Sequence, residues 1–412
     1  MMARLRWQEK LFTQIREKLY HPGTGLIYDY ITSFDPAERF SHLPSPEEIS
    51  HSFPNPCGWS TGMEDCAINT GLMLAWSVAA HGENTAFTRS LAGGLIRCGN
   101  VHGKHGFIVR GILPQDGSSC YSNSSRDQFT IAVYGLWCFL NGERIAEDLR
   151  HAGIRFICDT ADYCEKTVIE KNHYSLLRLD GGPAVVSGLW DCEPHEMLRL
   201  PMIYGAAWKL SGKQHYHDLL SRCMETGLHR TLEANPEGGA WWDMPLLQMQ
   251  CSIRFFEDSN VFPELQTEIR QGLHLAAKIA IGKLNGILDD AERFSGDWTV
   301  LYDNWRYLPM KLRRETIAPD GHTALFGGFP YLTPEFHPSY AQPNFLMRSI
   351  GNYLAVIALD QKLPEAAGSF FARTDRLMSG IDFEHFSGAG IVPMLYGSQL
   401  LQNRLGFGPE EP

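Results

Sequence analysis

The sequence lacks several features that assign proteins to well-known classes. It has no long block of Lys and Arg, and its formal net charge is −11 over 412 residues, so nucleic acid is not an expected partner. No apolar run reaches the length needed to span a membrane, and the start, MMARLRWQEK, has no apolar stretch of the signal-peptide kind. We therefore expect no membrane partner and a cytoplasmic location, with the periplasm as the alternative if a signal peptide has been removed.

Motifs that bind phosphate, dinucleotides or catalytic zinc are also missing. The sequence contains no Walker A loop, no glycine-rich dinucleotide loop and no HExxH helix. His322 and His337 lie near Asp320 and Glu335, but their spacing matches no established set of metal ligands. We therefore expect neither a metal ion nor a cofactor.

The cysteines form no recognisable framework. There are 10 Cys and no CxxC pair. Cys66 and Cys138 lie within helical patterns, which favours buried thiols in a reducing compartment. If the protein is exported, Cys57 with Cys66 and Cys98 with Cys120 are the pairs to consider as disulfides.

Helical patterns dominate what is present. Apolar residues recur at helical spacing in most of the chain, and short strands are expected only around residues 174–179. Two long irregular regions, 21–60 and 284–342, are too long for plain connections, so we expect them to shape a site. The expected helices cover residues 5–19, 62–80, 85–98, 127–140, 144–170, 194–210, 214–232, 242–256, 263–281, 299–312, 344–359, 364–378 and 390–401.

These helices alternate in character. Apolar helices begin near residues 62, 127, 194, 242, 344 and 390, and a more polar helix or the N-terminal helix precedes each of them. A closed double ring requires such alternation, because its inner helices are apolar all round and its outer helices on one face only. We predict an all-α fold, an (α/α)6 toroid of six helical hairpins, formed by a single domain over residues 1–412. An open α-solenoid is the main structural alternative.

Polar side chains gather where the apolar helices begin. Asp65 and Asp127 each follow a loop and enter such a helix, and Ser124 or Ser125 is positioned to cap the second one. In a toroid these entrances converge on one mouth, where tryptophans stack on sugar rings and carboxylates do acid–base work. The alternative is that each aspartate only interacts with its helix dipole. The distinctive residues at four entrances are Trp59, Glu64 and Asp65; Arg126, Asp127 and Gln128; Trp190, Asp191, His195 and Glu196; and Trp241, Trp242 and Asp243.

Two arginines are candidates for holding an anionic substrate. Arg110 and Arg126 flank a glycine- and proline-containing loop, and a guanidinium binds a carboxylate through two hydrogen bonds. The alternative is a salt bridge within the protein, to Asp116 or Asp127.

The chain resembles the six-hairpin glycosidases, especially the unsaturated glucuronyl and rhamnogalacturonyl hydrolases. The resemblance rests on residues 63–65 (Met-Glu-Asp), on residues 125–129 (Ser-Arg-Asp-Gln-Phe) and on the Trp-rich later entrances. It implies that Asp127 acts as acid and base in hydrating the double bond of a 4,5-unsaturated uronic acid, with Asp65 in support. The hydrated product is unstable and releases the neighbouring sugar. A β-glucuronidase on the same scaffold is the nearest variant.

Other functions remain open at this point. A polysaccharide lyase would use a Tyr or His base, with Tyr174 beside His173 or Tyr121 as candidates, whereas a sugar epimerase would use paired histidines such as His195 and His322. A helical binding scaffold without catalysis is a third alternative. The expected partner is an oligosaccharide, and a homo-oligomer is left open.

Overall fold

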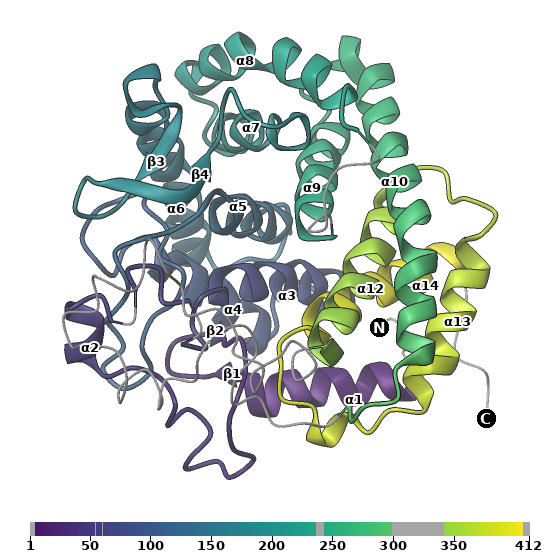
Figure 1. The fold of residues 1–412 in the computed structure, drawn as a ribbon. Coiled ribbons are helices and arrows are strands. Elements are labelled where there is room, and N and C mark those ends of the chain that lie inside the picture. Colours follow the sequence, from purple (N-terminus) through teal and green to yellow (C-terminus); the bar gives the residue numbers. More distant parts are fainter. Residues whose placement is uncertain (1–4, 54, 60, 236–242, 299–341, 407–412) are drawn as a thin grey trace.

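A computed structural model describes the chain except for residues 1–4, 54, 60, 236–242, 299–341 and 407–412 (Figure 1). Its described part is mostly helical, as the sequence predicts, and its strands form two small antiparallel pairs. Among these residues no helix combines the length and the apolar character needed to cross a bilayer.

The regular elements follow one another in a simple order. Strand β1 pairs with β2, with Tyr20 opposite Ile27, and β3 pairs with β4, with Ser175 opposite Gly188. The helices and strands are α1 (Arg6–Gln14), η1 (Ile15–Leu19), β1 (Tyr20–His21), β2 (Leu26–Ile27), α2 (Pro46–Ser50), α3 (Cys66–His81), α4 (Ala86–Cys98), α5 (Arg126–Leu140), α6 (Glu147–Thr167), η2 (Glu170–Asn172), β3 (Ser175–Leu177), β4 (Pro183–Gly188), η3 (Pro194–Glu196), α7 (Arg199–Ser211), α8 (Gln214–Leu232), α9 (Asp243–Ser259), η4 (Pro263–Leu265), α10 (Gln266–Arg293), α12 (Gln342–Leu359), α13 (Ala367–Ser379), η7 (Phe383–His385) and α14 (Ile391–Leu405).

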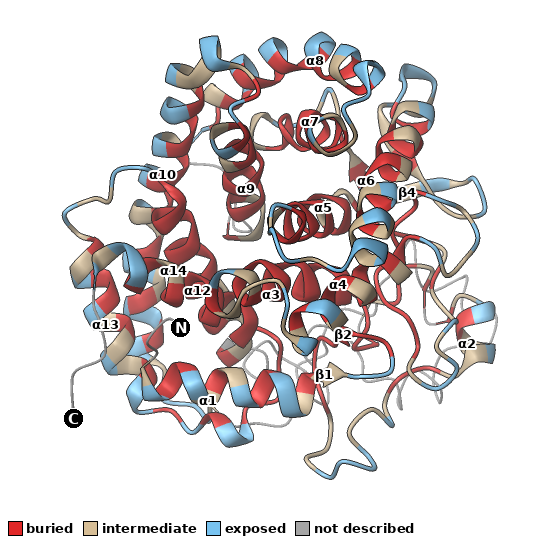
Figure 2. Ribbon diagram, turned by 180° about the vertical axis from the view of Figure 1, so that it is seen from behind, coloured by how far each residue is buried: buried red, intermediate tan, exposed pale blue. Residues whose placement is uncertain are grey.

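Six helices form a closed circuit of contacts. Helix α3 packs against α5, α5 against α7, α7 against α9, α9 against α12, α12 against α14, and α14 returns to α3 (Figure 1). The remaining long helices pack on the outside: α4 on α3, α6 on α5 and α7, α8 on α7, α10 on α9 and α12, and α13 and α1 on α14. Figure 2 shows the consequence for burial, because the six helices of the circuit are buried almost throughout, whereas α8, α10 and α13 expose one side.

Small residues allow neighbouring helices of the circuit to approach closely. Gly135 on α5 lies against the backbone of Gly71 on α3, and Gly397 on α14 lies against the backbone of Gly351 on α12. A Cβ atom at any of these four positions would collide with the backbone of the neighbouring helix. These pairs therefore fix two of the tightest helix contacts in the core.

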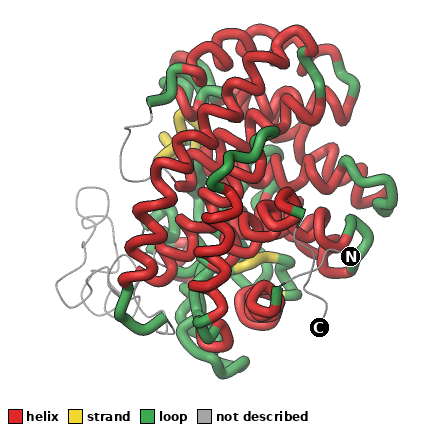
Figure 3. The backbone as a smooth tube through the Cα atoms, turned by 90° about the vertical axis from the view of Figure 1, so that its right-hand side faces the viewer, coloured by secondary structure: helices red, strands yellow, loops and turns green. Residues whose placement is uncertain are grey.

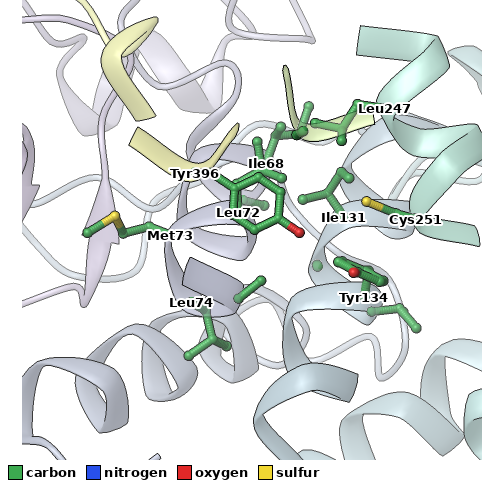
Figure 4. Close-up of a cluster of buried hydrophobic side chains, with 14 of the residues drawn as sticks. Ile68, Leu72, Met73, Leu74, Ile131, Tyr134, Leu247, Cys251 and Tyr396 are labelled. Carbon is green, nitrogen blue, oxygen red and sulfur yellow. The ribbon is translucent and has the colours of Figure 1, made fainter. Parts of the chain in front are cut away.

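Apolar side chains fill the space between the helices of the circuit. Ile68 and Leu72 of α3, Tyr134 of α5, Cys251 of α9 and Tyr396 of α14 point toward one another in the cluster of Figure 4. Figure 3 shows the same helices from the side, with the loops gathered at their ends. The helix ends are therefore the places where polar side chains can surround a cavity.

Most predicted helices are present, with shifts at their ends. The first ends as an α-helix at Gln14 and continues as a π-helical turn, and the helix expected from residue 194 begins as the short η3 before α7. The helix expected to end at residue 281 continues to Arg293, because Leu284 and Leu288 continue its buried stripe. The helix expected over residues 299–312 lies outside the described residues.

All ten cysteines are free thiols, and seven of them are buried. The two pairs considered for an exported protein, Cys57 with Cys66 and Cys98 with Cys120, are not bonded. Burial raises the pKa of the Cys66 thiol well above its ordinary value. Such thiols are therefore packing residues rather than nucleophiles.

Candidate active site

A cavity of about 420 Å³ lies where several helices of the circuit begin. This volume is within the range of pockets that bind small molecules. Carboxylates and arginines dominate its polar surface, and one tryptophan adds an aromatic face. Its lining residues are Trp59, Glu64, Asp65, Ile68, Arg110, Arg126, Asp127, Val186, Glu196, Asp243, Met244, Pro245 and Arg348.

Asp65 occupies the N-cap position of α3, and its carboxylate is turned toward α5. Gln128 donates from Nε2 to Oδ1 of Asp65 at 2.9 Å, and the guanidinium of Arg110 lies 3.5 Å from the same oxygen. The side chain keeps 35% of its surface exposed. Asp65 is thus held from two sides and still faces the cavity.

Asp127 is the second residue of α5. Ser125 caps this helix by accepting a hydrogen bond from the backbone N–H of Gln128 at 3.5 Å, so one of the two predicted caps is confirmed. Arg199, the first residue of α7, donates from Nη1 to Oδ1 of Asp127 at 2.7 Å. The Asp127 side chain is 25% exposed, whereas Arg199 is fully buried.

The arginines make ion pairs that differ from those expected. Arg126 pairs with Glu196, and Arg110 pairs with Asp65, so neither uses Asp116 or Asp127. Asp116 instead accepts hydrogen bonds from nearby serines. Arg126 pairs with Glu196 because the segment before α7 brings that residue close to the start of α5. The two residues are far apart in sequence, so the local sequence pattern does not predict their contact.

Glu196 is the buried centre of a charged network. Its carboxylate contacts Arg126, Arg199 at 3.6 Å and His195 at 3.6 Å. Burial raises the pKa of Glu196, although Arg199 and Arg126 oppose this and Asp127 adds to it. Burial, with further contributions from Arg199 and Arg126, lowers the pKa of His195 to about 4.

Another ion pair lies on the side of the cavity formed by α9 and α12. Arg348 donates from Nε to Oδ2 of Asp243 at 2.9 Å, and Asn352 donates to the same oxygen at 3.1 Å. Burial alone would raise the pKa of Asp243, but Arg348 and Asn352 outweigh it and the pKa is lowered. Asp243 is therefore held as a carboxylate between two helices.

Of the tryptophans predicted for the site, one lines the cavity and another does not. Trp59 lines the cavity, and the Arg110 guanidinium lies 6.0 Å from the centre of its ring. Trp190 packs against the core instead, and Asp191 is exposed outside the lining. Trp241 and Trp242 lie outside the described residues.

The remaining lining residue of note is Val186 in β4. It is 41% exposed, and its backbone has a φ of 54°, a left-handed conformation that is unfavourable for a β-branched residue. The β3–β4 ribbon thus presents a strained apolar residue at the cavity.

Sequence reasoning missed two arginines that matter here, Arg199 and Arg348. Arg348 is the single charged residue of α12, and Arg199 opens α7, whose one other charged residue is Lys209 near its end. Such a residue is almost never fully buried without a partner, so its position is a signal for a buried ion pair. The partners themselves, Asp127 and Asp243, are distant in sequence.

The described part of the chain contains no cluster of three or more His, Cys, Asp or Glu side chains suited to a metal ion. His322, His337, Asp320 and Glu335 lie outside it. Comparisons with protein-family models, with curated proteins and with solved structures gave no significant match to this chain.

Proposed function

We propose that the chain is a glycoside hydrolase for uronic-acid-containing oligosaccharides, in which Asp127 is the acid–base residue and Asp65 assists it. One observation carries the proposal: both aspartates line a single cavity at the starts of two neighbouring helices. Hydrolysis of a glycosidic bond uses a pair of carboxylates placed on either side of the reacting centre. An unsaturated uronyl hydrolase and a β-glucuronidase both fit this scheme.

The scaffold we propose is an (α/α)6 toroid. The closed circuit of α3, α5, α7, α9, α12 and α14, with a second set of helices packed outside it, supports this assignment over an open α-solenoid. A solenoid leaves its first and last helices apart, whereas α14 contacts α3.

The proposed roles follow from how the two aspartates are held. Asp127 keeps a quarter of its surface open while Arg199 fixes one of its oxygens, which leaves the other oxygen for a proton transfer. Asp65 is fixed by Gln128 in a similar way. In an unsaturated substrate Asp127 would protonate the double bond and take a proton from water, and the unstable hydrate would release the next sugar.

Arginines support a substrate that carries a carboxylate. Arg110, Arg126 and Arg348 all line the cavity, and a uronate matches a guanidinium in charge and shape. Trp59 offers an aromatic face for the sugar ring.

A hydrolase for a neutral glycoside is the second candidate, and the charges of the residues that line the cavity support it. Each of the three lining arginines already contacts a carboxylate of the protein, and the lining holds more carboxylates than arginines. A uronate would therefore have to compete with Asp65, Glu196 or Asp243 for its arginine.

The lyase and epimerase alternatives have less support. Tyr121 is buried and donates its hydroxyl to the carbonyl of Phe53 at 2.5 Å, and neither His173 nor Tyr174 lines the cavity. Of the two histidines considered for an epimerase, His195 sits beside Glu196 and His322 lies outside the described residues.

The test is a substrate screen with the purified protein. It compares unsaturated uronyl disaccharides, nitrophenyl β-glucuronide, nitrophenyl β-glucoside and a uronic-acid polymer, with release of the second sugar or nitrophenol, and absorbance of a conjugated uronate, as readouts. We expect turnover of a uronide, and we expect Asp127→Asn to lower kcat by about 10²–10⁴-fold while the fold is retained. Turnover of the glucoside alone would support the neutral-substrate candidate. New absorbance of a conjugated uronate from a polymer would indicate a lyase and overturn the proposal.

A further inference from the structure

We infer that Asp29 is a positioning residue, which binds the backbone of Glu64 and Asp65 where the chain enters α3 and thereby keeps the Asp65 carboxylate turned into the cavity. The inference rests on the proposed function where it concerns catalysis. Its structural part, the orientation of Asp65, stands independently of the substrate.

Asp65 occupies the position from which an aspartate normally caps a helix. At an N-cap, the carboxylate accepts a hydrogen bond from a backbone N–H of the first turn, and Asp is among the residues that do this best. In α3 the Asp65 side chain makes no such bond. Its Oδ1 instead accepts from Gln128 of α5.

The first-turn N–H of Ala67 donates instead to the carbonyl of Arg110 at 2.9 Å, and Asp29 binds the chain just before the helix. Its Oδ2 accepts from the backbone N–H of Glu64 at 2.6 Å and from that of Asp65 at 3.1 Å. Its Oδ1 accepts from Nδ2 of Asn69, one turn into α3, at 2.9 Å. One carboxylate thus binds the entering chain and the first turn together.

The backbone around Asp29 is fixed on both sides. Its N–H donates to the carbonyl of Gly62 at 3.0 Å, and its carbonyl accepts from Ala389, just before α14, at 2.7 Å. Two residues earlier, Ile27 donates to Oγ1 of Thr70 in α3 at 2.9 Å. The Asp29 carboxylate is therefore held at one place relative to both α3 and α14.

Holding this carboxylate there has an electrostatic cost. Burial, with the nearby charges of Asp65 and Glu64, raises the pKa of Asp29 well above its ordinary value. A neutral side chain could have filled the same space without that cost. The hydrogen bonds that Asp29 accepts from Glu64, Asp65 and Asn69 offset this cost.

The same separation of tasks is present at α5. There Ser125 caps the helix and Asp127, two residues later, is left to contact Arg199 and the cavity. In both helices a group other than the side chain of the site aspartate accepts a first-turn N–H, the carbonyl of Arg110 at α3 and the hydroxyl of Ser125 at α5. At α3 the Asp65 carboxylate is thereby available to Gln128, and Asp29 fixes the backbone from which that carboxylate projects.

The test uses Asp29→Ala and Asp29→Asn in the full chain, with Thr85→Ala as the matched control. Thr85 caps α4, accepting from Thr88 N–H at 3.1 Å, and does not line the cavity. Crystal structures show where Asp65 points, and kinetics with nitrophenyl β-glucuronide separate kcat from KM.

In Asp29→Ala the amides of Glu64 and Asp65 lose their acceptor, so we expect the chain entering α3 to shift and Asp65 to leave Gln128, with kcat reduced about 100-fold and KM little changed. Asp29→Asn keeps one acceptor oxygen, so its kcat should lie between that of the wild type and that of Asp29→Ala. If the alanine variant does not fold, the asparagine variant tests the inference. Thr85→Ala should lose stability but keep kcat. If Asp65 still contacts Gln128 in a folded variant and kcat is unchanged, the inference is wrong. If the wild-type protein cleaves no glycoside, the proposed function fails, and the orientation of Asp65 in the crystals alone decides the inference.

Discussion

Arg199 and Asp127 form a hydrogen-bonded ion pair of 2.7 Å across 72 residues of sequence. Arg199 is fully buried at the start of α7, and its other nitrogen lies 3.6 Å from Glu196. One guanidinium therefore holds a cavity-facing carboxylate and a buried one at the same time. A planar fork of donors suits this arrangement, and a lysine ammonium does not.

The first prediction concerns this pair. Arg199→Lys keeps the charge but cannot reach both carboxylates in the same geometry, so we expect kcat to fall markedly. Arg199→Ala leaves buried Glu196 with less compensation, and we expect the free energy of unfolding to fall by about 3–5 kcal/mol. Urea denaturation and kinetics measure the two effects.

Arg254 provides the matched control for Arg199. It also pairs with two carboxylates, Glu257 and Asp258, but it lies at the far end of α9 and is partly exposed. Arg254→Ala should also lower the free energy of unfolding, because Glu257 is nearly buried, but it should leave kcat unchanged. An equal loss of kcat in the Arg199 and Arg254 variants would argue against a special role for Arg199.

The second prediction separates the two readings of Arg126. This residue lines the cavity and is 22% exposed while it pairs with Glu196. If it also binds a substrate carboxylate, Arg126→Ala should lower kcat/KM for nitrophenyl β-glucuronide by roughly 10–100-fold, the value of a charged hydrogen bond. The loss for nitrophenyl β-glucoside should be much smaller. Equal losses on both substrates would assign Arg126 a structural role only.

Helices were the most predictable part of the chain, but the start of α3 was not predicted correctly. The apolar pattern located α3, but it placed the start at Gly62, whereas α3 begins at Cys66. Gly62 has a φ of 88°, which a right-handed helix excludes. The local pattern could not show this, because the conformation of Gly62 belongs to a loop in which its carbonyl accepts a hydrogen bond from Asp29.

The residues of the candidate site that lie at helix starts were predictable from the sequence, whereas their ion-pair partners were not. Asp65, Asp127, Arg110, Arg126 and Trp59 were all singled out by their place before or within the first turn of an apolar helix or beside its loop, and all line one cavity. The partners of these charged residues were not singled out, because each ion pair joins two elements that are far apart in sequence. Asp29 was missed for the same reason.

The third prediction concerns the charge of His195. Its pKa is lowered to about 4, first by burial and then by Arg199 and Arg126. His195 is therefore neutral at pH 6 and above, although it lies beside Glu196. We expect its NMR signal, assigned with a His195→Gln variant, to titrate near pH 4, well below the ordinary histidine value of 6.5. A titration near pH 6.5 would contradict this placement.

The last prediction concerns pH and the pair between Asp243 and Arg348. The pKa of Asp243 is lowered in the folded protein, so its carboxylate adds stability that is present above the unfolded pKa near 3.8 and is lost as the pH falls through the folded value. Asp243→Asn should cost about 3 kcal/mol at neutral pH, because it leaves the partly buried Arg348 without its counter-charge. Urea denaturation from pH 7 downward should show this difference as constant to about pH 5 and shrinking only below about pH 4.

Glu257 gives the control of opposite sign for this pH series. Burial raises its pKa despite the neighbouring Arg254, so its contribution is present below the unfolded pKa and is lost as the pH rises through the folded value. Relative to wild type, Glu257→Gln should therefore gain stability as the pH rises from 4 to 7, whereas Asp243→Asn should lose stability as the pH rises from below 4 to about 5, where its full deficit is reached. Parallel pH profiles for the two variants would mean that Asp243 is not held as a carboxylate by Arg348, and that the cavity wall between α9 and α12 is maintained by packing instead.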